Sequence, residues 1–473
     1  MRLFDAKLDA TKPAAFDVPM RSLRLVSKAF FASFCLATLM PTVALANGRF
    51  PIADHLVEDP KDPSHIVLRT TYGILETSDA GKSWSWICEF AVGYGGTQDP
   101  AIGVQSDGTI LAGIFEGLAV SHDRGCSWGF VGAPLASEYV IDVAVHKDDP
   151  SRAVAITSTG TGGGFHVIVA ETADNGQTWS QAGSAIMNDF IALTIDVAPS
   201  DPNRLYASGI VGKTFVPAIH RSDDRGVTWT RSYLDAAWAE DVPFIAAIDP
   251  TNPDRVYLRL SGGMEDHLLV SDDGALTFTD KYATMDDLLG AALSPDGSRI
   301  AIGGPKDGVL VASTADLVFQ QQSALYTRCL TWTNVGLYAC ANQFEDAFTV
   351  GLSTDEGKTF KGIYNLPDIC PITCPSGATT PAACTSTWPV LAATLGTDVC
   401  ACGNPSDCSS TSSSSSSGGV PEPLEGGGGC NCSVHPQAPG WGTLALAFLT
   451  SMGALLRHRP RRFAPLRRRN RRR

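Results

Sequence analysis

One aspartate recurs along the chain at a fixed place in an eight-residue pattern, and a repeated carboxylate could bind a cation or act in catalysis. The pattern is [S/T]-x-D-x-G-x-[S/T]-[W/F], first seen from Thr77 to Trp84. Its Asp-x-Gly core offers too few oxygen donors for calcium. It suits a turn, because the carboxylate accepts backbone N–H groups and glycine tolerates a positive φ. We therefore expect a structural role for Asp79, Asp123, Asp174, Asp224, Asp273 and Asp355.

The copies are evenly spaced, which makes the pattern the mark of a repeated structural unit. Successive copies begin 44, 51, 50, 49, 42 and 40 residues apart, counting a degenerate copy at Ser313. In the third unit the copy follows three apolar segments, residues 140–146, 153–157 and 165–171, and a fourth begins at Trp179. Four short antiparallel strands per unit are typical of a propeller blade. We predict an all-β, seven-bladed β-propeller over residues 47–366, with six or eight blades as the alternatives.

The repeated pattern resembles the Asp-box, or BNR repeat, of the superfamily that contains sialidases, sortilin-type receptors, xyloglucanases and photosystem II assembly-factor propellers. In that superfamily the motif lies at the propeller periphery, away from the ligand. The resemblance therefore implies a propeller fold and a structural role for the motif aspartates.

The resemblance also suggests an enzyme, an exo-sialidase-like glycoside hydrolase. Sialidases use three arginines that bind the substrate carboxylate, a tyrosine nucleophile with a glutamate partner, and an aspartate. Arg69 and Arg259 lie on predicted second strands but lack a third member, and residues 49–52 match the Arg-Ile-Pro type motif only superficially. The sequence shows no Ser-His-Asp spacing, phosphate loop or histidine-rich metal motif. We assign no catalytic residue, no metal and no cofactor.

A ligand site is expected on the face opposite the motif turns. Connections between second and third strands, and between blades, emerge there around a central channel. Their acidic and aromatic residues suit a cationic, carbohydrate or protein partner, although ordinary solvated loops would have a similar composition. The candidates are Tyr72, Tyr94, Asp99, Glu116, Glu138, Trp238, Glu240, Asp241 and His267, with Tyr139, Asp189 and Asp266 beside them.

The cysteines indicate an oxidising, exported setting. A hairpin that turns at residues 334–335 would place Cys329 opposite Cys340, and Cys88 and Cys126 could link adjacent blades. We expect three disulfides within a Cys-rich segment, residues 367–408, although its C-x3-C and C-x-C spacings leave zinc as an alternative. The six cysteines of that segment are Cys370, Cys374, Cys384, Cys400, Cys402 and Cys408.

The first 46 residues are predicted to be a signal region. A basic stretch from Met20 precedes an apolar stretch, residues 29–40, and Ala44-Leu45-Ala46 is a small-residue cleavage site. We expect translation to start at Met20 and the mature chain to start at Asn47. The alternative is a buried core helix.

The C-terminal end combines a linker, a cysteine pair, an apolar segment and an arginine-rich tail. A Ser/Gly/Pro linker, residues 409–429, precedes a segment, residues 430–473, that holds Cys430 and Cys432, one short apolar helix and an arginine-rich tail. This order resembles the MYXO-CTERM sorting tail, which is recognised and removed during export and leaves the protein at the cell surface. A transmembrane anchor is the alternative, since 17 uncharged residues, 440–456, are just long enough to span a bilayer.

The charge distribution narrows the choice of partners. The chain carries −13 overall, but residues 47–456 hold 20 basic against 46 acidic residues, a net charge of −26. A body this acidic repels phosphate backbones and argues against nucleic-acid binding. We predict a monomeric, exported, surface-anchored and non-catalytic binding or scaffold module for protein or glycan ligands, handled by export and sorting machinery. The sialidase-like hydrolase is the alternative.

Overall fold

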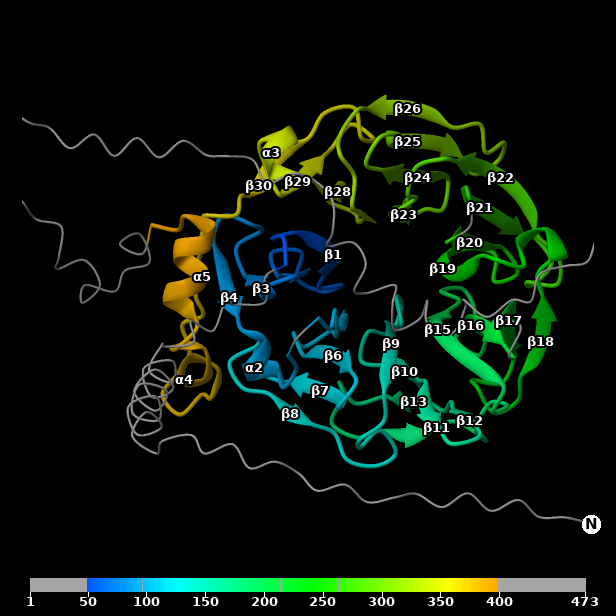
Figure 1. Cartoon of the computed structure of the whole chain (residues 1–473), viewed down its shortest axis with the longest axis horizontal. Helices are drawn as coiled ribbons and strands as arrows, with labels where there is room; N and C mark the ends of the chain where they lie inside the picture. Colours follow the sequence, from blue (N-terminus) through cyan, green and yellow to red (C-terminus); the bar gives the residue numbers. More distant parts are fainter. Residues whose placement is uncertain (1–48, 96, 213–214, 263, 399–473) are drawn as a thin grey trace, which may run out of the picture. The chain divides into compact units, whose positions relative to one another are not determined.

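A computed structural model describes residues 49–95, 97–212, 215–262 and 264–398. They form seven four-stranded antiparallel sheets arranged as blades around a ring (Figure 1). The predicted seven-bladed, all-β propeller is confirmed. The predicted signal region, linker and sorting tail lie outside the described residues. Among the helices of the described part, none is long and apolar enough to cross a membrane.

Each blade is built from consecutive strands, with the first strand nearest the ring axis (Figure 1). Blade one contains β1 (Ala53–Glu58), β2 (Ile66–Thr70), β3 (Gly73–Thr77) and β4 (Trp84–Ile87). Blade two contains β5 (Ala101–Val104), β6 (Ile110–Ile114), β7 (Gly117–Ser121) and β8 (Gly129–Phe130). Blade three contains β9 (Val140–Val145), β10 (Ala153–Thr157), β13 (Val169–Thr172) and β14 (Ser180–Gln181), with a hairpin of β11 (Thr159–Thr161) and β12 (Gly164–His166) inserted.

The remaining blades follow the same order. Blade four contains β15 (Phe190–Val197), β16 (Leu205–Val211), β17 (Val216–Ser222) and β18 (Thr230–Tyr233). Blade five contains β19 (Val242–Ile248), β20 (Val256–Ser261), β21 (Asp266–Ser271) and β22 (Thr279–Thr284). Blade six contains β23 (Gly290–Leu293), β24 (Arg299–Gly304), β25 (Gly308–Ser313) and β26 (Gln320–Ser323). Blade seven contains β27 (Cys329–Trp332), β28 (Leu337–Cys340), β29 (Val350–Ser353) and β30 (Lys361–Tyr364).

Short helices occur in the connections and after the last blade. They are α2 (Glu89–Val92) and the 3₁₀ turn η1 (Ala236–Trp238) between blades, α3 (Gln343–Asp346) between β28 and β29 of blade seven, and α4 (Thr380–Cys384) and α5 (Trp388–Leu395) after blade seven. The hydrophobic core is divided among the blade interfaces. In one cluster Tyr206 and Ile219 of blade four pack with Val256 and Leu258 of blade five. The apolar strands therefore stabilise the ring by packing blade against blade.

The motif aspartates organise the turn between third and fourth strands. In the first copy, the Asp79 carboxylate accepts the N–H groups of Lys82 and Ser83 at 2.9 Å and the Ser83 hydroxyl at 2.6 Å. Two successive residues, Ala80 and Gly81, take positive φ values of 61° and 83°. In the last copy, the Thr359 N–H and the hydroxyls of Thr359 and Ser353 lower the pKa of Asp355 to about 2. Each of these two carboxylates thus binds groups of its own turn.

Closure of the ring relies on side chains that join blade seven to blade one. Glu58 on β1 accepts the hydroxyls of Thr333 and Tyr338 at 3.0 and 3.1 Å. On the same interface, the Tyr72 and Tyr364 hydroxyl oxygens lie 2.6 Å apart. Burial raises the pKa of the Glu58 carboxyl, although its two hydroxyl partners oppose the shift. These contacts hold the two ends of the repeat array together.

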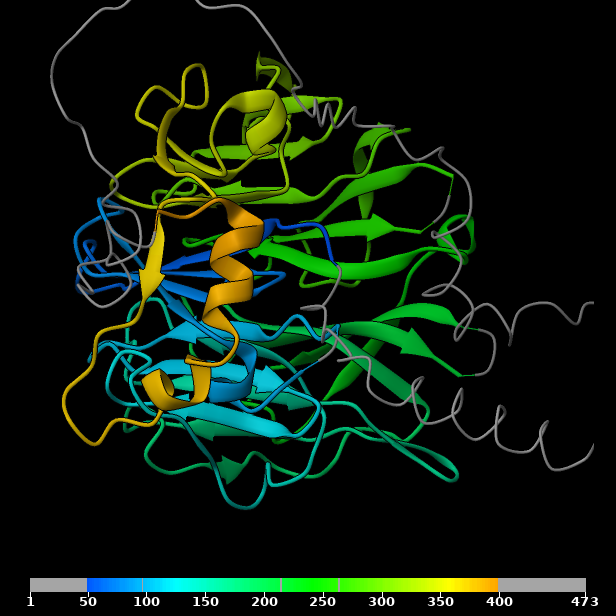
Figure 2. The same cartoon turned by 60° about the vertical axis from the view of Figure 1, so that its left-hand side comes forward.

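The chain after blade seven forms a strap, residues 369–395, across the outer edge of blades one and two. Its first element, β31 (Ile369–Pro371), adds to β4 as a parallel fifth strand. Helices α4 and α5 follow, and in Figure 2 they cross the outside of the ring. Trp388 of the strap packs on Trp86 with ring centroids 5.6 Å apart. The strap thus covers an edge strand that would otherwise expose unpaired backbone groups.

The disulfides correct part of the sequence interpretation. Cys329 pairs with Cys340 across the β27–β28 hairpin, which confirms that prediction. The predicted Cys88–Cys126 pairing is wrong, because both residues bond to the strap. The bridges are Cys88–Cys384 and Cys126–Cys374, so the expectation of disulfides confined to the Cys-rich segment is wrong as well. Cys370 is also disulfide-bonded.

Replacing Ala80 by glycine is expected to stabilise the protein by about 0.5–1 kcal/mol. Ala80 is exposed and has a positive φ of 61°, which costs a residue with a Cβ more than it costs glycine. Thermal unfolding of Ala80→Gly and of the control Ala236→Gly, in a turn of ordinary backbone, tests this. A lower melting temperature for Ala80→Gly than for wild type would contradict the assignment.

Removing one strap disulfide, by Cys88→Ala with Cys384→Ala, is expected to cost about 2–4 kcal/mol of unfolding free energy. Removing the Cys126–Cys374 bridge as well should cost more than the sum of the two single losses, because either bridge alone keeps the strap docked. Limited proteolysis should then cut within residues 372–395 only when both bridges are missing. Equal cutting after a single loss would show that the bridges act independently.

Candidate ligand-binding face

The ring has two different faces. Because successive strands of a blade are antiparallel, the β1–β2 and β3–β4 types of turn emerge on one side, which we call the motif face. The β2–β3 turns and the connections between blades emerge on the other side, which we call the connection face.

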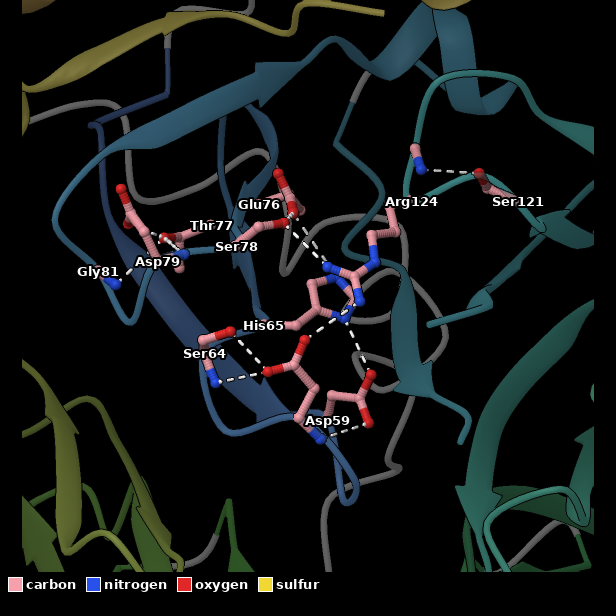
Figure 3. A network of polar contacts seen from close by, with 12 residues as sticks. Asp59, Ser64, His65, Glu76, Thr77, Ser78, Asp79, Gly81, Ser121 and Arg124 are labelled. Carbon is pink, nitrogen blue, oxygen red and sulfur yellow. Dashed lines mark hydrogen bonds and ion pairs between the residues drawn. The ribbon is translucent and has the colours of Figure 1, made fainter. Parts of the chain in front are cut away.

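A network around His65 is the most enzyme-like group on the motif face (Figure 3). His65 Nδ1 lies 3.1 Å from Asp59 Oδ2, and its Nε2 lies 3.8 Å from Glu76 Oε1. Arg124 of blade two donates hydrogen bonds of 3.2 Å, from Nη1 to the Ser78 hydroxyl and from Nη2 to the Asp62 carboxylate. An imidazole between two carboxylates could transfer protons. Its side chain is completely buried, however, so a substrate has no access to it.

The other blades explain this network as a structural clamp. Blade three has Arg152 at the position of His65, and its Nη2 lies 3.6 Å from Glu171, the counterpart of Glu76. In blade five Arg255 holds the same position, 3.2 Å from Asp272. His65 therefore belongs to a repeated contact between the β1–β2 turn and the motif turn. Sequence analysis did not single it out, and only superposing the repeats reveals its equivalence to the arginines.

Three predicted ligand residues are buried and serve the fold. The Tyr72 hydroxyl contacts Tyr364 at the ring closure, and Tyr94 is 5% exposed. Asp241 is buried as well. Their burial leaves these side chains little surface for a ligand, and a ligand contact by them stays a prediction.

The remaining predicted residues lie on or near the connection face, most of them with polar partners. Asp99 makes two 2.8 Å hydrogen bonds with Arg49, His267 lies 2.8 Å from Asp280, and Glu116 accepts the Gln98 amide. Glu138 binds Thr159 and His166, Asp189 binds Arg231, and Asp266 accepts the Leu288 N–H. Glu240 and Tyr139 are exposed, and Trp238 lines a cavity at the outer edge.

Sequence analysis missed the large apolar side chains exposed on the connection face. Such side chains are scarce on the motif face, where the exposed ones are Val227, Leu276, Val318 and Val335. The connection face carries aromatic rings and methionines, the most exposed being Met264 at 87%. Two pairs touch, Phe50 with Phe344 and Phe115 with Tyr139, at centroid distances of 5.6 and 5.3 Å. The set is Phe50, Phe90, Phe115, Tyr139, Met187, Phe215, Met264, Met285 and Phe344.

The same face is acidic. Among its described residues the basic ones are Arg49, Lys306 and Arg328, and the first two are paired with Asp99 and Asp286. The acidic residues of the connections are Glu89, Asp99, Glu116, Glu138, Asp189, Asp235, Glu240, Asp241, Glu265, Asp286, Asp287, Asp307, Glu345 and Asp346. Exposed apolar groups in an acidic surround favour a partner that is both apolar and cationic.

The two arginines considered for a sialidase site are already bound to the protein. Arg69 Nε lies 2.8 Å from Asp54 Oδ1, and its Nη1 donates to the Pro100 carbonyl. Arg259 Nη1 donates to the Leu288 and Leu289 carbonyls at 2.6 and 3.2 Å. To receive a substrate carboxylate, each guanidinium would have to give up these contacts.

Two carboxylates on innermost strands have strongly shifted pKa values. Asp142 on β9 accepts the N–H of Ile195 on the neighbouring β15 at 2.9 Å, which links blades three and four. Burial raises the pKa of Asp142 to about 7 and that of Asp196 to about 6. The backbone N–H groups that donate to each carboxylate oppose this shift. In the described part of the chain, no three His, Cys, Asp or Glu side chains come together as a metal site.

Comparison with known proteins finds likeness only to solved structures, at low sequence identity. No family model and no curated protein matches the chain. An ancestral GH74 enzyme aligns at 13% identity, covering 68% of this chain and 40% of its own, with a TM-score of 0.44. The GH74 xyloglucanase from Xanthomonas campestris aligns at 16%, covering 65% and 63%, with a TM-score of 0.34. YCF48 bound to a D1 peptide aligns at 20%, covering 50% and 71%, with a TM-score of 0.35. The chain thus spans less than two thirds of both GH74 structures.

Asp196→Asn is expected to stabilise the protein at pH 8 by about 1–3 kcal/mol and to have little effect at pH 4. A carboxyl whose pKa is raised in the folded state favours folding below its unfolded pKa. That contribution is lost as the pH rises through about 6. Asparagine keeps an oxygen for the Val197 N–H but carries no charge. Melting curves from pH 4 to 8 test this, and a wild-type protein that gains stability over this range relative to Asp196→Asn would refute it.

Proposed function

We propose that this chain is an exported binding protein that holds a protein partner on the connection face of its propeller. The concentration of exposed aromatic and methionine side chains on that one face supports the proposal. Monomeric soluble proteins seldom expose such side chains together, and aromatic residues and methionine are enriched at interfaces. Methionine also adapts its shape to a partner.

The partner that we propose is a cationic segment with apolar side chains. The acidic connections would attract it and orient its approach, and the apolar groups would supply most of the affinity. A neutral glycan would gain little from the negative charge of the acidic connections. A hydrolytic role is less favoured, because Arg69 and Arg259 are engaged by the protein's own groups.

Export and surface attachment are part of the same proposal. The disulfides of the ring and strap are consistent with an extracellular protein. We infer that the chain is a member of the Asp-box superfamily, that the signal region is cleaved before Asn47, and that the MYXO-CTERM-type tail keeps the protein at the cell surface.

Selection of peptides from a random display library tests the partner class. We expect the purified protein to enrich peptides rich in Lys or Arg and aliphatic residues, with binding that weakens as salt increases. Phe115→Ser with Tyr139→Ser should weaken the selected peptides at least tenfold. The control, Val318→Ser with Val335→Ser, changes exposed valines on the motif face and should leave binding unchanged.

Four results would reject the proposal. One is binding that weakens in the motif-face control but not in the connection-face variant. Another is enrichment of acidic peptides, and a third is turnover of a fluorogenic sialoside that disappears in Arg69→Ala or Arg259→Ala. Binding to a glycan array in place of the peptides would also reject it, in favour of a carbohydrate ligand.

A further inference from the structure

A cavity of about 270 Å³ lies at the outer edge of the ring between blades four and five. Three aromatic rings line it, from Tyr233 at the end of β18, Trp238 on η1 and Phe278 before β22. Leu276 and Asp235 also line the cavity. In Figure 1, β18 and β22 are the outer strands of two neighbouring blades. None of the connection-face apolar residues described above belongs to this wall.

The cavity lies beside a motif copy that ends in phenylalanine, where the copy of the preceding blade ends in tryptophan. Blade four ends its motif with Trp229, whose indole N–H donates to the Gly226 carbonyl at 3.0 Å. Blade five has Phe278 at that position, a smaller ring without an N–H group. Trp238 approaches from the connection that enters blade five, on a short turn that Asp235 caps by accepting the Ala237 N–H at 2.9 Å. An aromatic wall is thus assembled from two segments, residues 233–238 and 276–278.

The wall is held in place before any ligand arrives. Arg231 Nη1 donates to the Tyr233 hydroxyl at 3.2 Å, and its guanidinium carbon lies 5.8 Å from the Tyr233 ring centroid. Arg231 is fixed by two hydrogen bonds, of 3.0 and 2.7 Å, to Asp189. Tyr233 is nevertheless 55% exposed, so a ligand can reach it. A rigid, accessible aromatic surface lowers the entropy cost of binding.

We propose that this cavity binds an organic cation of the quaternary ammonium class. Aromatic ring faces attract such cations through their quadrupole, and a group of aromatic rings is their usual binding site. Asp235 brings one negative charge to the wall, while the Arg231 charge is directed at Asp189. The methyl groups of the cation would contact Leu276 and the aromatic rings. The aromatic wall of this cavity contains none of the apolar residues of the proposed partner surface, and the proposal does not depend on that surface.

Titration with choline and with its uncharged isostere 3,3-dimethyl-1-butanol tests the proposal in the purified protein, by calorimetry and by NMR. We expect choline to bind at least tenfold more tightly than the isostere, since the two differ mainly in charge. Trp238→Ala should weaken choline at least tenfold. Asp235→Asn keeps an oxygen for the turn cap but removes the charge, and should weaken choline about fivefold.

Tyr139→Ala, an aromatic loss elsewhere on the ring, is the control and should leave choline binding unchanged. Melting curves of each variant establish that the ring is still folded. Equal affinity for choline and the isostere, no choline binding, or choline binding that survives both Trp238→Ala and Asp235→Asn would overturn the proposal. So would preferential binding of a neutral monosaccharide. The peptide selection distinguishes the two sites, because Trp238→Ala should leave the selected peptides bound.

Discussion

The junction between blade seven and blade one is the interface on which the whole ring depends. Every other pair of blades is joined by a short covalent connection, whereas blades seven and one lie at opposite ends of the array and meet when it closes. Both blades are built from four consecutive strands of their own. Their junction therefore relies on Glu58 with its two hydroxyl donors and on the paired tyrosines Tyr72 and Tyr364, together with the strap that follows blade seven and pairs with β4.

The two faces of the ring differ in how their side chains are used. On the motif face, carboxylates bind their own turns, and arginines, or His65 in blade one, tie neighbouring turns together (Figure 3). The connection face exposes the aromatic and methionine side chains and has an excess of acidic residues, and for this reason we propose that recognition takes place there. The strap reinforces the frame from the outside and leaves the connection residues open.

The sequence predicted the features that arise from local and repeated signals. The motif spacing predicted the blades, and the hairpin between Cys329 and Cys340 predicted their bridge. Cys88 and Cys126 were paired wrongly, because their partners belong to a segment whose docking site depends on the closed ring. Composition suggested Tyr72 and Tyr94 as ligand residues, but only three-dimensional packing shows that they are buried. The exposed phenylalanines and methionines were overlooked because an apolar residue in a loop is read as core unless its orientation is known.

The strap also has a consequence for biogenesis. Blades two to six depend mainly on neighbours close in sequence and can form as the chain emerges, whereas β4 gains its outer partner only when residues 369–371 appear. Until then blade one presents an apolar edge, Trp84–Ile87, open to pairing with another molecule. The strand that covers this edge follows all seven blades in the chain, so a chain that stops before residue 369 leaves Trp84–Ile87 without its outer partner.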